Sequence, residues 1–129
     1  MPQKDVVRTE NAPAPFQGAP YSQAVMFGDL VFIAGQVALR PGHDAIVGDT
    51  IEAQAEQVCE NLKAILEAAG SSFGNVLQTT IYLTDFADFP GLNEVYGRYV
   101  GDKPPARATV EIAGLPMGAK VEIAVIAHR

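Results

Sequence analysis

The sequence predicts an α+β sandwich, in which one mixed sheet of about six strands carries two helices on one face. Short β-rich runs occur at both ends of the chain, two amphipathic segments separate later strands, and turn residues join other strands directly. With 129 residues, the chain has the length of a single domain spanning 1–129. Two separate cores would leave about 65 residues each, which is marginal for stability.

The first part of the chain is predicted to form three strands. Residues 6–9 are a short strand, and the proline-rich stretch 11–20 is an ordered loop. Residues 22–27 and 30–34 flank a Gly-Asp turn and are therefore predicted to pair as a hairpin. Residues 40–48 contain Pro and Gly and are predicted to form a loop.

The clearest element is an amphipathic helix over 51–69. Apolar residues repeat there at steps of three and four, and Gly70 stands where a helix ends. Asp49 and Thr50 are both suitable N-caps, and Glu52 stands three residues after Asp49, as a capping box requires.

The remaining elements alternate between strand and helix. They are a strand over 76–84, a helix over 89–100 with Pro90 in its first turn, a strand over 107–112, a turn over 114–118 and a strand over 121–127. If both helices lie on one face, nothing in the chain remains to cover the other face. Self-association is therefore expected.

Composition excludes several classes of function. Nine Lys and Arg against fifteen Asp and Glu give a net charge of −6, which disfavours general binding to nucleic acid. The lone Cys59, with His43 and His128 far apart, offers neither a disulfide nor metal-ligand spacing. No apolar run approaches the length of a membrane span, and the N-terminus lacks the pattern of a secretory signal. We therefore expect no membrane association and a cytoplasmic location.

Two charged residues stand where a core would favour apolar ones. Arg107 enters a strand behind Pro104-Pro105-Ala106, and its planar guanidinium matches a carboxylate in bidentate fashion. Its partner is either an acid of the same chain or a ligand. Glu122 lies on an apolar strand face, where burial would raise its pKa into a range useful for a general acid or base. The alternatives for Glu122 are an edge-strand position facing water, or pairing with Lys120 or Arg107.

Three further residues are weaker candidates. The phenol of Tyr21, held by the preceding proline, is able to donate to a substrate or simply to contact water. Asn93 is disfavoured inside a helix, so it either serves a site or faces solvent. Cys59 lies on the apolar stripe of the long helix and is interpreted as a small core residue.

Seven segments in order resemble the RidA (YjgF/YER057c/UK114) family of imine deaminases, over about residues 9–127. The segments are APYSQA at 19–24, GQV at 35–37, NLK at 61–63 with EAAGSS at 67–72, TTIYL at 79–83, NEVY at 93–96, PARATV at 105–110 and LPMGAKVEI at 115–123. The resemblance implies a chorismate-mutase-like fold and a homotrimer with sites between subunits. It also implies hydrolysis of reactive 2-imino acids, such as 2-iminobutanoate and 2-iminopropanoate, to 2-keto acids and ammonia. That activity protects against damage by reactive metabolites and needs no cofactor.

Carried over from the resemblance, Arg107 would hold the substrate carboxylate and Glu122 would orient or activate water. Tyr21 and Asn93 would line the pocket, Gly35 would offer backbone to the ligand, and Thr109 would lie beside Arg107. Two positions depart from the pattern common among active members. Ala34 replaces a Ser before the Gly-Gln pair, and Thr109 replaces a Cys. The lost Ser hydroxyl is worth about 0.5–1.5 kcal/mol as a neutral hydrogen bond.

Two other functions remain open from the sequence. One is RNA cleavage linked to inhibition of translation, against which the negative charge and the lack of interleaved basic and aromatic residues argue. The other is a non-catalytic trimer that binds small carboxylates or acts as a chaperone, which the Ala34 substitution leaves open.

Overall fold

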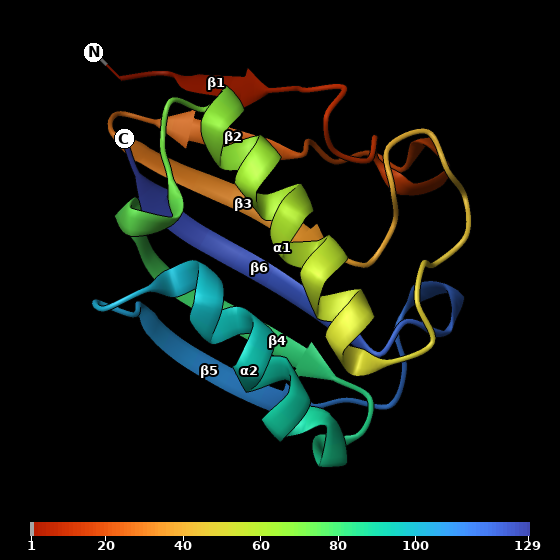
Figure 1. Ribbon diagram of the computed structural model, residues 1–129. Helices are drawn as coiled ribbons and strands as arrows, with labels where there is room; N and C mark the ends of the chain where they lie inside the picture. The colour runs from red at the N-terminus through yellow and green to blue at the C-terminus, as the bar shows by residue number, and fades with distance from the viewer. Residues whose placement is uncertain (1) are drawn as a thin grey trace.

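The computed structural model describes residues 2–129, which form one six-stranded sheet with two helices (Figure 1). The helices are α1 (Ile51–Ala68) and α2 (Phe89–Val100). The strands are β1 (Lys4–Val7), β2 (Ala24–Phe27), β3 (Leu30–Gln36), β4 (Val76–Leu83), β5 (Ala106–Glu111) and β6 (Val121–His128). The predicted α+β architecture is confirmed. None of the helices within residues 2–129 has the length and apolar character needed to cross a bilayer.

The strands are ordered β1-β2-β3-β6-β4-β5, so the last strand in sequence lies in the middle of the sheet. Only β4 and β5 run parallel among the described strands, and α2 is the crossover that joins them. Both helices lie on the same face of the sheet, α1 over β3 and β6 and α2 over β4 and β5 (Figure 1). Within residues 2–129, the opposite face of the sheet has no helix over it (Figure 1).

The long helix begins at Ile51, as predicted, but its N-cap is not the residue that the capping-box pattern suggested. Thr50 is the N-cap, and its hydroxyl accepts a hydrogen bond of 3.1 Å from the Ala53 N–H. Glu52 therefore lies one position too early to complete a capping box, and that prediction was wrong. The helix ends before Gly70, whose φ of +77° is the left-handed conformation predicted for a helix end.

The first strand is Lys4–Val7 and not 6–9, because a buried side chain draws the following residues out of the sheet. Gln23 is 4% exposed, and its amide oxygen accepts the Thr9 N–H at 2.8 Å. Its amide nitrogen lies 3.0, 3.2 and 2.8 Å from the carbonyl oxygens of Thr9, Ala12 and Pro13. These contacts give the loop 11–20 the order that its prolines predicted.

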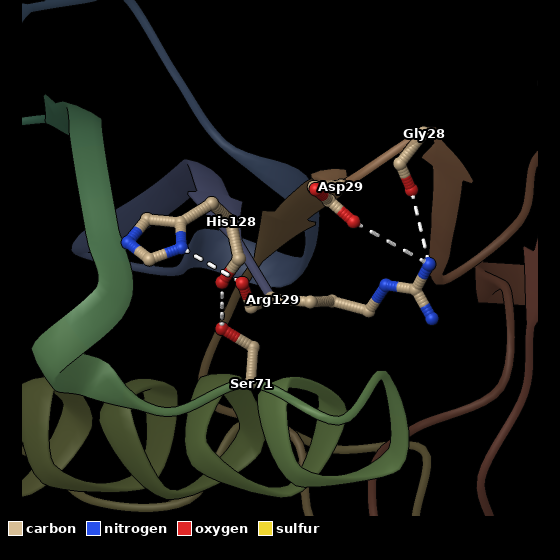
Figure 2. Close-up of polar contacts among 5 residues, drawn as sticks. All are labelled: Gly28, Asp29, Ser71, His128 and Arg129. Atoms are coloured by element: carbon tan, nitrogen blue, oxygen red, sulfur yellow. Dashed lines mark hydrogen bonds and ion pairs between the residues drawn. The ribbon is translucent and has the colours of Figure 1, made fainter.

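The C-terminal end of β6 is fastened on two sides (Figure 2). The Ser71 hydroxyl, just beyond α1, donates to the His128 carbonyl at 2.6 Å. The Arg129 guanidinium donates to the Gly28 carbonyl at 3.1 Å and lies 3.9 Å from the Asp29 carboxylate. The central strand is thereby joined to both the helix layer and the β2–β3 turn.

Candidate functional site

Arg107 lies on β5, on the face of the sheet that carries the helices. Its register partner on β4 is Thr79, which is buried, and parallel partners share a face. The guanidinium carbon lies 5.2 Å from the ring centroid of Phe89 and 5.1 Å from that of Tyr96, both on α2. Within residues 2–129 the only ion pair joins Arg129 to Asp29. The alternative in which Arg107 pairs with an acid of its own chain is therefore wrong.

Asn93 shares the helix face that meets Arg107. It follows Phe89 by four residues and precedes Tyr96 by three, which places all three side chains on one side of α2. Its Oδ1 is buried and has no hydrogen-bond partner among the described residues. A buried acceptor left unbonded costs about 1–3 kcal/mol. Asn93 is thus not a solvent-facing helix residue, and its oxygen is available to a donor from outside the chain.

Glu122 lies on β6, which is central and not at a sheet edge, so the edge-strand interpretation was wrong. The side chain is half-buried and forms no ion pair with Lys120 or Arg107. Burial raises the pKa of the Glu122 carboxyl above its ordinary value of 4.5, in the direction expected from its apolar strand. The carboxyl consequently holds a proton more readily than an exposed glutamate does.

Gly35 lies directly against this carboxyl. A Cβ at position 35 would stand 2.7 Å from Cδ of Glu122 and clash with its Oε2. Any larger residue at position 35 would therefore displace the carboxyl. The structure brings Gly35 and Glu122 together, and the preceding Ala34 is fixed in the hairpin by its N–H, which donates to the Gln23 carbonyl at 2.9 Å.

Arg107 and Glu122 lie on opposite faces of the sheet. Thr79 and Tyr82 of β4 are three residues apart and so point to opposite faces, and their respective partners are Arg107 and Glu122. Thr109, two residues after Arg107, shares its face and is half-buried. Within one chain, the candidate residues form two groups. Arg107 and Thr109 lie on the helix-bearing face together with Asn93 of α2, and Glu122 lies with Gly35 on the open face.

Tyr21 belongs to neither group. It lines a cleft of about 1010 Å³ between the N-terminal loop and residues 41–42. Its hydroxyl oxygen accepts a hydrogen bond of 2.7 Å from the Phe16 N–H, so the phenol is not simply solvated. The hydroxyl hydrogen remains able to donate to another molecule, since Tyr21 is 45% exposed.

The open face of the sheet carries several apolar side chains beside Glu122, and it contains a depression of about 170 Å³ that Gln78 and Thr80 help to line. Phe32 and Val110 are 38% and 42% exposed there, and Ala124 and Ile126 of β6 lie between them. An apolar surface of this kind marks an interaction site more often than a solvated face. The self-association that the sequence led us to expect over this face stays a prediction.

The sequence did not reveal the contacts that hold Arg107. None of Phe89, Tyr96 and Thr79 was a candidate site residue from the sequence. The available signal was the i, i+4, i+7 spacing of Phe89, Asn93 and Tyr96, which places two rings beside a polar side chain.

Cys59 is part of the hydrophobic core and not of the candidate site. Cys59 is fully buried, as predicted, and burial raises the pKa of its thiol to about 12, so it is no nucleophile near neutral pH. The described residues contain no group of three His, Cys, Asp or Glu able to hold a metal ion.

Comparisons with known proteins agree with this architecture. Residues 9–129 match the family described as Endoribonuclease L-PSP. A RutC family protein of Pyrococcus horikoshii is 48% identical over 126 residues, covering 98% of both chains. The mouse protein named 2-iminobutanoate/2-iminopropanoate deaminase is 43% identical, covering 96% of this chain and 90% of its own. The crystal structure of RidA from the Antarctic bacterium Psychrobacter sp. PAMC 21119 superposes with a TM-score of 0.91 at 43% identity, covering 97% of this chain and 99% of that chain.

Proposed function

Because the chain belongs to the Endoribonuclease L-PSP family, which includes proteins named RidA, we propose that it hydrolyses 2-imino acids and their enamine tautomers to 2-keto acids and ammonia. The name of the mouse relative gives this reaction class for a protein of 43% identity. The substrate would be a small molecule that carries a carboxylate next to an electrophilic C=N carbon.

One observation carries the proposal: Arg107 is half-buried and has no carboxylate partner among residues 2–129. A guanidinium in that position favours an anion, and its fork fits a carboxylate. The unbonded Oδ1 of Asn93, on the helix face above it, would accept a hydrogen bond from the substrate nitrogen. A 2-keto acid lacks that N–H donor, so this contact would favour the imine over the product.

Glu122 would serve as the proton carrier. Its carboxylate takes a proton from water as the water oxygen bonds to the imine carbon and the C=N electron pair moves to nitrogen. The Glu122 carboxyl then returns that proton to the nitrogen, which becomes the NH2 group of a carbinolamine. The same carboxylate takes the hydroxyl proton of this carbinolamine and passes it to the nitrogen, so that the C–N bond breaks, ammonia departs and the C=O bond forms. The raised pKa of Glu122 brings it closer to the operating pH, where a group that both accepts and returns a proton is most effective.

The site would be completed between copies of the chain, because Arg107 and Glu122 lie on opposite faces of one sheet. In a homotrimer, the Arg107 group of one subunit would meet the Glu122 group of the next. The apolar open face supplies surface for such an assembly. Thr109 and Tyr21 would then border the pocket from different subunits.

The test couples a purified dehydratase or amino-acid oxidase to this protein and follows decay of the imine. Arg107→Ala is expected to slow decay about tenfold to a hundredfold, because a charge-assisted hydrogen bond is worth about 1.5–3 kcal/mol. Arg98→Ala, an exposed arginine on α2, is the matched control and should leave the rate unchanged. Equal decay rates in the wild type and Arg107→Ala would remove the catalytic proposal.

Complementation tests the division of the site between copies. Arg107→Ala and Glu122→Ala proteins are unfolded together in equal amounts and refolded. With random mixing in a ring, about a quarter of the sites would receive both intact residues and recover activity. Mixing that recovers no activity, although mixed assemblies are detected by mass spectrometry, would place both residues in the site of a single chain.

RNA cleavage is the alternative that the family description suggests. The net charge of −6 opposes binding to a phosphate backbone. Binding to single-stranded RNA at low ionic strength that weakens as salt rises would favour this alternative. A non-catalytic carboxylate binder would lose its ligand on Arg107→Ala and keep it on Glu122→Ala, whereas a deaminase loses turnover with both.

A further inference from the structure

We propose that Tyr96 is a positioning residue for Arg107: its ring holds the guanidinium in place without neutralising it, and Thr79 fixes the ring. This inference rests on the proposed function for its catalytic consequence, but the positioning itself is independent of any substrate. Neither Tyr96 nor Thr79 was a candidate site residue from the sequence.

The need for such a residue follows from the chemistry of arginine. An arginine side chain carries about 2 kcal/mol of rotamer entropy, which must be removed before two-point binding to a carboxylate is favourable. A carboxylate of the same chain would hold the guanidinium but would also compete with the substrate for its N–H donors. An aromatic face attracts the cation from above and leaves the in-plane N–H donors free.

Tyr96 meets this need with a fixed ring. Its centroid lies 5.1 Å from the guanidinium carbon of Arg107, within the range of a cation–π contact. The side chain is 5% exposed, and its hydroxyl lies 2.7 Å from the hydroxyl of Thr79, which is 1% exposed. The hydrogen bond is wholly buried, so the ring has one orientation.

The sheet register links this hydrogen bond to the guanidinium. Thr79 and Arg107 are direct partners on the parallel strands β4 and β5. The residue that fixes the ring and the residue that the ring holds therefore stand side by side on one face. Phe89 contributes the second ring at 5.2 Å and is stacked on Phe86 with centroids 5.0 Å apart.

Nuclear magnetic resonance of the Arg107 Nε–H group tests the positioning without a substrate. Tyr96→Leu and Thr79→Val are both expected to lower its order parameter, while Thr79→Ser, which keeps the hydroxyl, should preserve it. Tyr99→Leu is the matched control on α2, because the Tyr99 hydroxyl contacts Glu60 and its ring contacts Phe73. An unchanged order parameter in a folded Tyr96→Leu protein would overturn the proposal.

Binding of 2-oxobutanoate, followed by calorimetry, tests the consequence. Tyr96→Leu should weaken binding about threefold to thirtyfold, as loss of a partly buried cation–π contact predicts, and should raise KM more than it lowers kcat. In an Arg107→Ala background the same change should have no further effect on binding, because Tyr96 acts through Arg107. An equal weakening in both backgrounds would show a merely structural role.

The two proposals fail in different ways. If Tyr96→Leu lowers the order parameter of Arg107 but the wild-type protein does not accelerate imine decay, the positioning proposal stands and the deaminase proposal fails. If the wild-type protein accelerates imine decay but Arg107 is equally ordered in the Tyr96→Leu protein, the deaminase proposal stands and the positioning proposal fails.

Discussion

Gly35 leaves no room for a side chain above the carboxyl of Glu122, since a Cβ there would stand 2.7 Å from the carboxyl carbon. This contact joins a strand on one side of β6 to the group proposed to carry protons. The backbone at position 35 therefore sets where the Glu122 carboxyl lies.

Gly35→Ala is expected to displace the Glu122 carboxyl and to destabilise the protein by about 1 kcal/mol, at the low end of the overpacking range, because the clashing atoms are the far end of a flexible side chain. Chemical denaturation measures the free energy of unfolding. In a Glu122→Ala background the same change should cost little, which gives a coupling energy of similar size. Gly97→Ala is the control, because a Cβ added to that helical glycine would have nothing within 4 Å, and alanine there should be neutral or stabilising. Additive effects of Gly35→Ala and Glu122→Ala would contradict the contact.

Glu122 should make stability depend on pH. Its pKa is raised in the folded state, so between the ordinary value and the raised value the folded protein binds more protons than the unfolded chain. Stability from this group is present below about pH 4.5 and is lost as pH rises through the folded pKa. The Glu122→Gln side chain stays neutral at every pH. The free energy of unfolding of this variant, relative to that of the wild type, should therefore be higher at pH 8 than at pH 4. A constant stability difference between Glu122→Gln and the wild type across this range would be evidence against burial of the charge.

Gln23→Ala should destabilise the protein by about 1–3 kcal/mol, because buried backbone groups of residues 9–13 lose their partner. Urea denaturation measures the loss, and limited proteolysis should cut the loop 11–20 sooner. The exposed Gln3→Ala is the matched control and should change neither result. If Gln23→Ala were as stable as Gln3→Ala, the loop would be held by other contacts.

Met117→Gly should stabilise the protein by about 1 kcal/mol. Met117 has a φ of +57°, a left-handed conformation that costs a residue with a Cβ about 1–2 kcal/mol, partly offset by the entropy of glycine in the unfolded chain. Thermal unfolding measures the gain. Met117→Ala keeps the Cβ and should therefore show no gain from relief of this strain. Equal midpoints of thermal unfolding for Met117→Gly and Met117→Ala would mean that the strain is absent.

The sequence predicted element boundaries well where local signals decide them. Residues 89–100 form the predicted helix, with Pro90 in its first turn. The first strand was misplaced because Gln23, fourteen residues beyond Thr9, takes the hydrogen bonds of that segment. No local pattern reveals such a distant partner.

The candidate site shows the same limit. Residue types marked Arg107 and Glu122 as unusual, but strand order decides their surroundings, and strand order comes from packing of the whole chain. That β6 is central, and that the two residues lie on opposite faces, follows only from the pairing of β6 with β3 and β4. The rings around Arg107 likewise depend on where the crossover helix lies.

The division of Arg107 and Glu122 between two faces also determines how damage would spread in a mixed population of subunits. On the proposed assembly, a copy defective in one of the two residues disables a single site, so activity falls in proportion to its abundance. A copy defective in both disables the sites on either side of it, so the intact fraction falls as the square of the wild-type share. The doubly altered chain would therefore behave as the more dominant allele, although each of its substitutions alone already impairs every site of a uniform assembly.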